Sequence, residues 1–245
     1  MEVHQHTRTP RKKWSHYFWE FLMLFLAVFC GFLAEYQLEH TIEKSREKQY
    51  IKSFAEDLAM DTIDLEDRIR FCDRTSNSAD SLIVILTNKN KNEVAGEIYY
   101  FFRFIHRSQP FTVNDRTIVQ LRNAGGMRLI KNKNVTDSML NYYKAVDFIK
   151  FLYEEQIELK RSLRPHFNKF LYGIDYSKVI DNENRVVRSK EVLKLKPVDE
   201  ESINTFILTL QNIKGINMGI KMRLSELKDQ AKLIRGYIFT EYHLK

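Results

Sequence analysis

The hydrophobic pattern opens with an almost unbroken apolar stretch at residues 14–34, which reads WSHYFWEFLMLFLAVFCGFLA. The stretch has 21 residues, and Glu20 is its only residue with a formal charge. At about 1.5 Å per residue, a helix of this length spans roughly 31 Å, close to the ~30 Å hydrocarbon core of a bilayer. The pattern therefore predicts a single membrane-spanning helix.

Polar residues dominate the next segment, residues 35–50, which we interpret as a solvated helical stalk. No proline or glycine occurs between Glu35 and Asp73, so the helix is expected to leave the membrane without a break. From Ile51 onward an apolar stripe recurs at spacings of three and four residues, which places it on one helix face. Its members are Ile51, Phe54, Leu58, Leu65, Ile69 and Cys72.

Carboxylates are interleaved with this stripe at Glu56, Asp57, Asp61, Asp64 and Glu66. Carboxylates inside a helical bundle can hold two metal ions, but such sites also use histidines in Glu-x-x-His pairs. No such pair occurs in the sequence. We therefore expect a solvated face here and no metal site.

Turn signals divide the middle of the chain into shorter helices. A break is expected at residues 75–78, followed by a short buried helix around residues 82–86, although a strand is also compatible with that apolar run. A third helix at residues 93–107 is expected to end before Pro110. A fourth is expected to be capped by Asn114 or Asp115 and to end at the glycine pair 125–126, where a positive φ is available.

A long helix is expected next, capped by Asn134 or Thr136 and stopped by Pro165. A short helical piece at residues 167–172 follows it. Residues 174–197 have no regular pattern, but residues 186–187 and 192–195 are candidates for a small hairpin.

The C-terminal helix, from Asp199 onward, has the clearest pattern of the extramembrane part. Its apolar residues alternate at spacings of three and four over five heptads, as in a coiled-coil seam. The seam residues are Ile203, Phe206, Leu210, Ile213, Asn217, Ile220, Leu224, Leu227, Ala231, Ile234 and Ile238. Asn217 is the polar member, which can fix register or partner number. We expect the seam to pack on helices of the same chain, with a seam between chains as the alternative.

These elements predict an all-α fold. The N-terminal transmembrane helix continues into an elongated, antiparallel helical bundle, with a possible small hairpin near residues 180–196. The corresponding domains are a basic cytoplasmic N-terminus (1–13), the transmembrane helix (14–34) and an extracytoplasmic bundle (35–245) with the stalk at its start. The C-terminal helix is long enough to return along the first helix, so we expect the C-terminus to point back towards the bilayer.

Composition and charge limit the classes of partner that we expect. The net charge of +7 is spread along the chain, which permits weak attraction to anionic lipid but does not form a nucleic-acid footprint.

Four basic residues precede the span and favour a cytoplasmic N-terminus. They are Arg8, Arg11, Lys12 and Lys13. The segment after the apolar run has no small-x-small cleavage site, so we expect an uncleaved anchor. Two cysteines, Cys30 and Cys72, offer the extramembrane part no disulfide framework.

The span contains two features relevant to association. Ala27, Gly31 and Ala34 place small residues on one face, which allows two spanning helices to approach closely. Together with Asn217 they form the candidate helix-packing interface. Glu20 lies near the membrane edge with His16 four residues earlier, so we expect a local polar pair, with a buried partner in another protein as the alternative.

The segment from Asn114 to Tyr143 has a distinctive pattern, N-x-x-T-I-V-x-L-R-x-x-G-G-M-R-L-I-K-N-K-x-V-x-D-x-x-L-N-Y-Y. Together with the basic N-terminus and the span, it resembles an uncharacterised family of bacterial single-span membrane proteins of the Gram-negative cell envelope. The resemblance implies a bitopic, helical envelope protein in the inner membrane, with a periplasmic C-terminal domain. It implies no activity and no catalytic residues.

Functional motifs are absent from the sequence: HExxH, CxxC, GxSxG and GxGxxG do not occur. We therefore predict no catalytic, cofactor-binding or metal-binding residues and no small-molecule substrate. The expected function is that of a non-enzymatic scaffold, adaptor or accessory subunit acting through helix–helix contacts, as a homo-oligomer or with another envelope membrane protein. The alternative is a sensor-like module that binds a ligand or partner and signals through the span.

Overall fold

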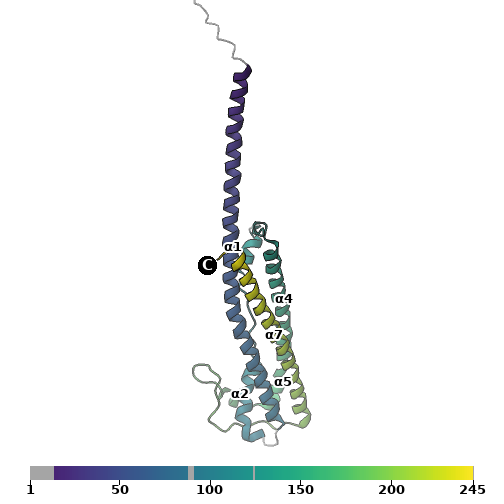
Figure 1. Cartoon of the computed structure of the whole chain (residues 1–245). Helices are drawn as coiled ribbons and strands as arrows, with labels where there is room; N and C mark the ends of the chain where they lie inside the picture. The colour runs from purple at the N-terminus through teal and green to yellow at the C-terminus, as the bar shows by residue number, and fades with distance from the viewer. Residues whose placement is uncertain (1–13, 88–90, 124, 245) are drawn as a thin grey trace, which may run out of the picture. The chain divides into compact units, whose positions relative to one another are not determined.

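The computed structural model describes residues 14–87, 91–123 and 125–244. The protein is 81% helical with almost no strand, so the all-α prediction is confirmed (Figure 1). The chain divides into two compact units, Met1–Gln49 and Tyr50–Lys245. Helix α1 (Trp14–Leu86) contributes to both, and we describe each unit by itself.

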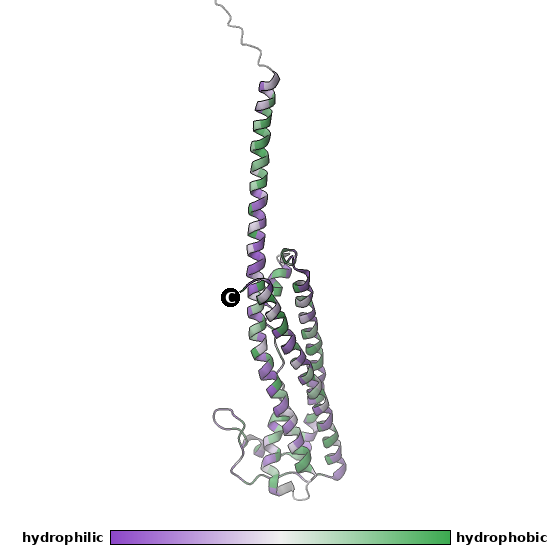
Figure 2. Ribbon diagram, in the orientation of Figure 1, coloured by the Kyte–Doolittle hydropathy of each residue, from purple (hydrophilic) through white to green (hydrophobic). Residues whose placement is uncertain are grey.

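In the first unit, α1 consists of an apolar segment followed by a polar one. Figure 2 shows the change along the helix from hydrophobic to hydrophilic residues. Within the described part of the chain, α1 is the one helix that is long and apolar enough to cross a membrane. No part of its most apolar window is buried against the protein. Because this apolar surface is bare, it needs lipid or another helix around it.

Helix α1 continues without interruption to Leu86, so the predicted break at residues 75–78 is wrong. Polar residues suggested a turn, but here their hydroxyls bond to carbonyls of the preceding helical turn. Thr75 donates to Phe71 O at 3.0 Å, and Ser78 donates to Arg74 O at 2.8 Å. Hydroxyls satisfied in this way are compatible with a helix interior.

The core of the second unit is formed by α1 from residue 50 onward, α4 (Lys133–Arg161) and α7 (Glu200–Glu241). Figure 1 shows α4 and α7 running alongside each other. The predicted seam of α7 is buried from Phe206 to Ile238. Its C-terminal half, from Ile220 onward, belongs to one cluster with Leu58 of α1 and Tyr142 of α4. The seam therefore packs within the chain, as expected.

A second core lies around α2 (Ala95–Ile105) and α5 (Leu163–Phe170), together with the first half of α7. A 3₁₀ turn (Lys91–Val94) precedes α2, and α6 (Gly173–Ser177) follows α5. Phe102 is at the centre, with ring centroids 4.6 Å from Phe167 and 5.0 Å from Phe206. Phe102 of α2 thus packs against aromatic rings of both α5 and α7.

Two predicted helix boundaries are wrong. The N-cap of α4 is Asn132, whose side chain accepts from Val135 N at 3.3 Å, and neither Asn134 nor Thr136. Helix α4 ends at Arg161, and Pro165 lies in the first turn of α5, where a missing N–H costs nothing. The cap of α7 at Asp199 is confirmed, because its carboxylate accepts from Ser202 N at 2.7 Å.

The predicted hairpin pairing is also wrong. Residues 186–187 and 192–195 do not pair with each other in the described chain. Instead, Val186 forms an isolated antiparallel bridge with Ile180, and Leu195 forms one with Leu171. The segment is held by the second core, where Leu193 is buried, and by Tyr99, whose hydroxyl donates to Lys194 O at 2.8 Å.

Candidate functional site

The small residues predicted as a packing face are open in the first unit. Ala27, Gly31 and Ala34 are all exposed. A Cβ added at Gly31 would meet nothing within 4 Å. The face is therefore free to receive another helix. In the same segment, His16 Nε2 lies 3.7 Å from Glu20 Oε1, with both side chains about half exposed.

Asn217, in the second unit, is buried and bonded within the chain. Its Oδ1 accepts from Gln156 Nε2 of α4 at 2.6 Å, and Gln156 Oε1 accepts from the Ser108 hydroxyl at 2.8 Å. Asn217 Nδ2 has no hydrogen-bond partner in the described structure. This hydrogen bond thus fixes the register of α7 against α4, which is a known role of polar residues at seam positions.

Two of the carboxylates expected on a solvated face are fully buried, which corrects that prediction. Asp57 is 1% exposed and Asp61 is 0% exposed. Asp57 accepts from Thr117 N at 3.0 Å and from Arg116 at 3.0 Å. It therefore caps the N-terminus of α3 (Arg116–Asn123) from a different helix. Asp115, one of the two expected cap residues, directly precedes α3, and its carbonyl accepts from Val119 N at 2.9 Å.

Asp61 binds the segment just before α3. Its Oδ1 accepts from Asn114 N and from Asn114 Nδ2, both at 2.7 Å, and its Oδ2 accepts from the Tyr142 hydroxyl at 2.8 Å. Burial raises the pKa of the Asp61 carboxyl, and these three hydrogen bonds oppose that rise. The distinctive 114–143 segment is thus tied to α1 by two buried acids. Within this segment, α3 ends at Asn123, and Gly125 beyond it has φ 63°, as the predicted glycine turn requires.

A buried cation lies at the junction of α4 and α1. Lys160 is 5% exposed, its Nζ donates to Arg107 O, and the ring of Phe71 is 5.9 Å away. Burial lowers the pKa of Lys160 to about 8. Burial also raises the pKa of neighbouring Cys72 to about 11, so this thiol is a core residue and not a nucleophile at neutral pH.

Ion pairs join α1 to α7 at a regular interval. The three acidic residues on α1 are seven residues apart, and so are the three lysines on α7. The pairs are Asp80 with Lys214, Asp73 with Lys221 at 2.6 Å, and Glu66 with Lys228 at 2.5 Å. We call this the ion-pair ladder. The ladder was not predicted from the sequence, although the matching seven-residue spacings of acidic and basic residues are present in it.

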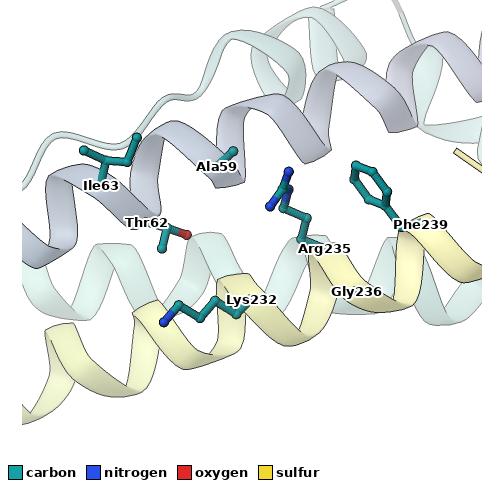
Figure 3. A pocket seen from close by; sticks show the side chains of 7 residues that line it. All are labelled: Ala59, Thr62, Ile63, Lys232, Arg235, Gly236 and Phe239. Atoms are coloured by element: carbon teal, nitrogen blue, oxygen red, sulfur yellow. The ribbon is translucent and has the colours of Figure 1, made fainter. Parts of the chain in front are cut away.

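A pocket lies next to the last pair of the ladder (Figure 3). Its volume is about 500 Å³, within the range of small-molecule sites. Residues of α1 form one wall and residues of α7 the other, as Figure 3 shows. The lining residues are Ala59, Thr62, Ile63, Lys232, Arg235, Gly236 and Phe239.

The outer faces of α4 and α7 expose large apolar side chains. Phe148 and Phe151 of α4 are 47% and 52% exposed, and their rings stack at a centroid distance of 6.4 Å. Met218 and Met222 of α7 are 75% and 51% exposed. Arg223 connects the two helices, with its guanidinium 5.5 Å from the Phe148 ring. We call these four apolar residues the outer apolar row.

The described ranges contain no group of three His, Cys, Asp or Glu side chains placed to hold a metal ion. His106 and His166 of the second unit both make packing contacts: His106 Nδ1 is 2.9 Å from Phe102 O, and the His166 ring lies 5.0 Å from that of Phe206. No protein-family model matches the chain, and no similar protein was found among curated sequences or solved structures.

Proposed function

We propose that this protein is a non-enzymatic, single-pass membrane scaffold or accessory subunit of the bacterial cell envelope, acting through helix–helix contacts. The apolar segment of α1 would cross the inner membrane. The basic residues before it favour a cytoplasmic N-terminus, which would put the bundle in the periplasm. The observation that carries the proposal is the outer apolar row, because exposed apolar side chains in neighbouring helices are typical of interaction sites.

The internal contacts support the scaffold role. Buried polar bonds link α1 to α3 through Asp57 and α4 to α7 through Asn217. Such bonds hold helices in one arrangement, so the outer surface keeps a fixed shape. A fixed surface favours assembly, because less conformational freedom is lost when the partner binds.

The proposed partner is a second copy of this chain. Two chains anchored in one membrane have the same orientation, so a two-fold axis along the membrane normal brings identical faces together. Both the open face at Ala27 and Gly31 and the outer apolar row could be used in this way. In the row, Phe148 and Phe151 supply the aromatic surface that is enriched at interfaces.

The test is the mass of the full chain purified in mild non-ionic detergent. We expect a homo-oligomer, and we expect the double substitution Phe148→Glu/Phe151→Glu to reduce it at least tenfold in association constant. Lys144→Glu/Lys150→Glu, at exposed positions of the same helix, is the control and should retain assembly. A strictly monomeric wild-type protein would contradict the proposal, and a stoichiometric second protein would replace the proposed partner.

A second candidate function is supported by the pocket between α1 and α7. In this alternative the bundle is a sensor-like module whose ligand acts on the helix that also contains the span. The continuity of α1 from Trp14 to Leu86 supports such coupling. Signalling would require a partner protein, and the readout is a ligand-dependent change in assembly.

A further inference from the structure

The ion-pair ladder has a place for a fourth pair that the sequence leaves empty. Seven residues before Glu66 on α1 is Ala59, and seven residues after Lys228 on α7 is Arg235. The cation of the fourth pair is therefore present, but a methyl group stands where the other pairs have a carboxylate. Ala59 and Arg235 both line the pocket (Figure 3).

The pocket is positively charged. In the described chain, neither Arg235 nor Lys232 forms an ion pair. Glu66, the ladder carboxylate next to the pocket, is bonded to Lys228 at 2.5 Å. Lys232 adds to the positive potential at Glu66, which helps to hold the pKa of that carboxyl below its usual value after the stronger effect of Lys228. Two cationic side chains, Arg235 and Lys232, thus line the same pocket as Ala59.

The other walls of the pocket are apolar. Ile63 is 67% exposed although it is a large aliphatic residue. Phe239 forms the opposite end of the pocket in Figure 3, and its ring centroid is 5.0 Å from the Arg235 guanidinium. The Thr62 hydroxyl already donates to Leu58 O at 2.8 Å, so it presents its methyl group and an acceptor oxygen. A ligand here would need an apolar part beside its charge.

We propose that this pocket binds an amphiphilic carboxylate. The carboxylate pairs with Arg235 and Lys232 and so completes the ladder, and the hydrocarbon part lies against Ile63 and Phe239. Arginine suits this role because its planar guanidinium binds a carboxylate through two parallel hydrogen bonds. The inference gives a ligand class to the sensor-like candidate and does not depend on the scaffold proposal.

The test uses the full chain in non-ionic detergent micelles and measures octanoate binding by titration calorimetry, with empty micelles as the blank. Ala59→Glu supplies the missing carboxylate from the protein itself. We expect it to weaken octanoate binding at least tenfold while leaving the melting temperature unchanged or raised. Met60→Glu places the same charge on the adjacent, exposed residue outside the pocket and should bind octanoate as the wild type does.

A second variant keeps the test independent of the first. Arg235→Gln should also weaken octanoate binding at least tenfold, whereas Arg223→Gln, on the same helix outside the pocket, should not. Acetate and 1-octanol, which each lack one half of the ligand, should bind at least tenfold more weakly. Absence of octanoate binding, equal binding of either half, or unchanged binding by Ala59→Glu would overturn the proposal. The scaffold test measures mass and the pocket test measures the heat of octanoate binding, so failure of one proposal can be told apart from failure of the other.

Discussion

At the scale of single residues, the buried acids of α1 act as caps for a segment far away in the sequence. A helix N-terminus usually takes its capping oxygen from the residue just before it. Here Asp57 provides the oxygen for Thr117 N from the neighbouring helix. The backbone donors before and within α3 are therefore satisfied only when α1 and the 114–117 segment meet. Local structure and tertiary packing thus form together.

Replacing Asp61 should be strongly destabilising. Asp61→Ala leaves the two Asn114 donors and the buried Tyr142 hydroxyl without their acceptor. We expect a loss of about 3 kcal/mol in the free energy of unfolding, as for other buried groups that lose a charged partner. Thermal unfolding followed by circular dichroism at the helical band measures it. Asp64→Ala, an exposed carboxylate of the same helix, should change stability by less than about 0.5 kcal/mol.

Lys160 should make stability depend on pH. Its pKa is about 8 in the folded protein, below the ordinary value of 10.5. Below pH 8 both states hold the proton, and the folded state bears the full cost of a buried charge, about 3 kcal/mol. Between pH 8 and pH 10.5 the folded state releases the proton first, so this contribution raises stability as pH rises.

The measurement compares wild type with Lys160→Met in unfolding experiments at several pH values. At pH 7 the variant should be more stable by about 2 kcal/mol, since the lost hydrogen bond to Arg107 O offsets part of the gain. The wild type should approach the variant between pH 8 and pH 9. Above pH 9 the raised pKa of Cys72 acts in the opposite direction in both proteins. An exposed-lysine control, Lys150→Met, should show no such convergence, and a parallel profile for Lys160→Met would contradict the assignment.

At the scale of elements, periodicity predicted which faces are buried better than where helices end. The α7 seam and the α1 stripe were evident because apolar residues at three-four spacing have few alternatives. The ends were harder. Thr75 and Ser78 resemble turn residues in sequence, and only the i−4 hydroxyl bonds show that they continue the helix. Likewise, the burial of Asp57 and Asp61 depends on a distant segment that sequence spacing does not reveal.

The ladder should contribute charge complementarity more than bulk stability. Partly exposed ion pairs are worth about 0.2–1 kcal/mol each. Asp73→Lys places two cations together and should lower the melting temperature, and the exchange Asp73→Lys/Lys221→Asp should restore most of it. The difference between the two variants should shrink in 1 M salt, where exposed charges are screened. If the exchanged pair is no more stable than the single variant, the ladder makes no net contribution.

At the scale of the whole molecule, the second unit should fold without the span. Most of its core residues come from α1 beyond residue 50, from α2 to α5 and from α7, and in the described part of the chain no core residue precedes Ile51. A fragment of residues 50–245 is expected to be helical with a cooperative thermal transition by circular dichroism. A fragment of residues 50–198 lacks α7 and should lose the transition, because both cores use residues of that helix. A non-cooperative 50–245 fragment would contradict this division.

The candidate sites differ in how far they could be predicted from the sequence alone. The small-residue face and Asn217 could be predicted because each is visible within one helix. The ladder and its pocket lie between α1 and α7, and finding them requires the register of one helix against the other. Ala59 carries no chemical signal by itself. It becomes informative only opposite Arg235.

Because the charges repeat every seven residues, α7 could also pair with α1 in a second register, shifted by one heptad. Sliding α7 by one heptad would place Lys221, Lys228 and Arg235 opposite Asp80, Asp73 and Glu66, so every carboxylate would again meet a cation. The apolar seam repeats at the same interval, and most of its residues would be replaced by similar ones. Asn217 is the marker that tells the two registers apart, since only the native register sets it against Gln156. One amide pair thus removes a degeneracy that both the charges and the hydrophobic residues leave in place.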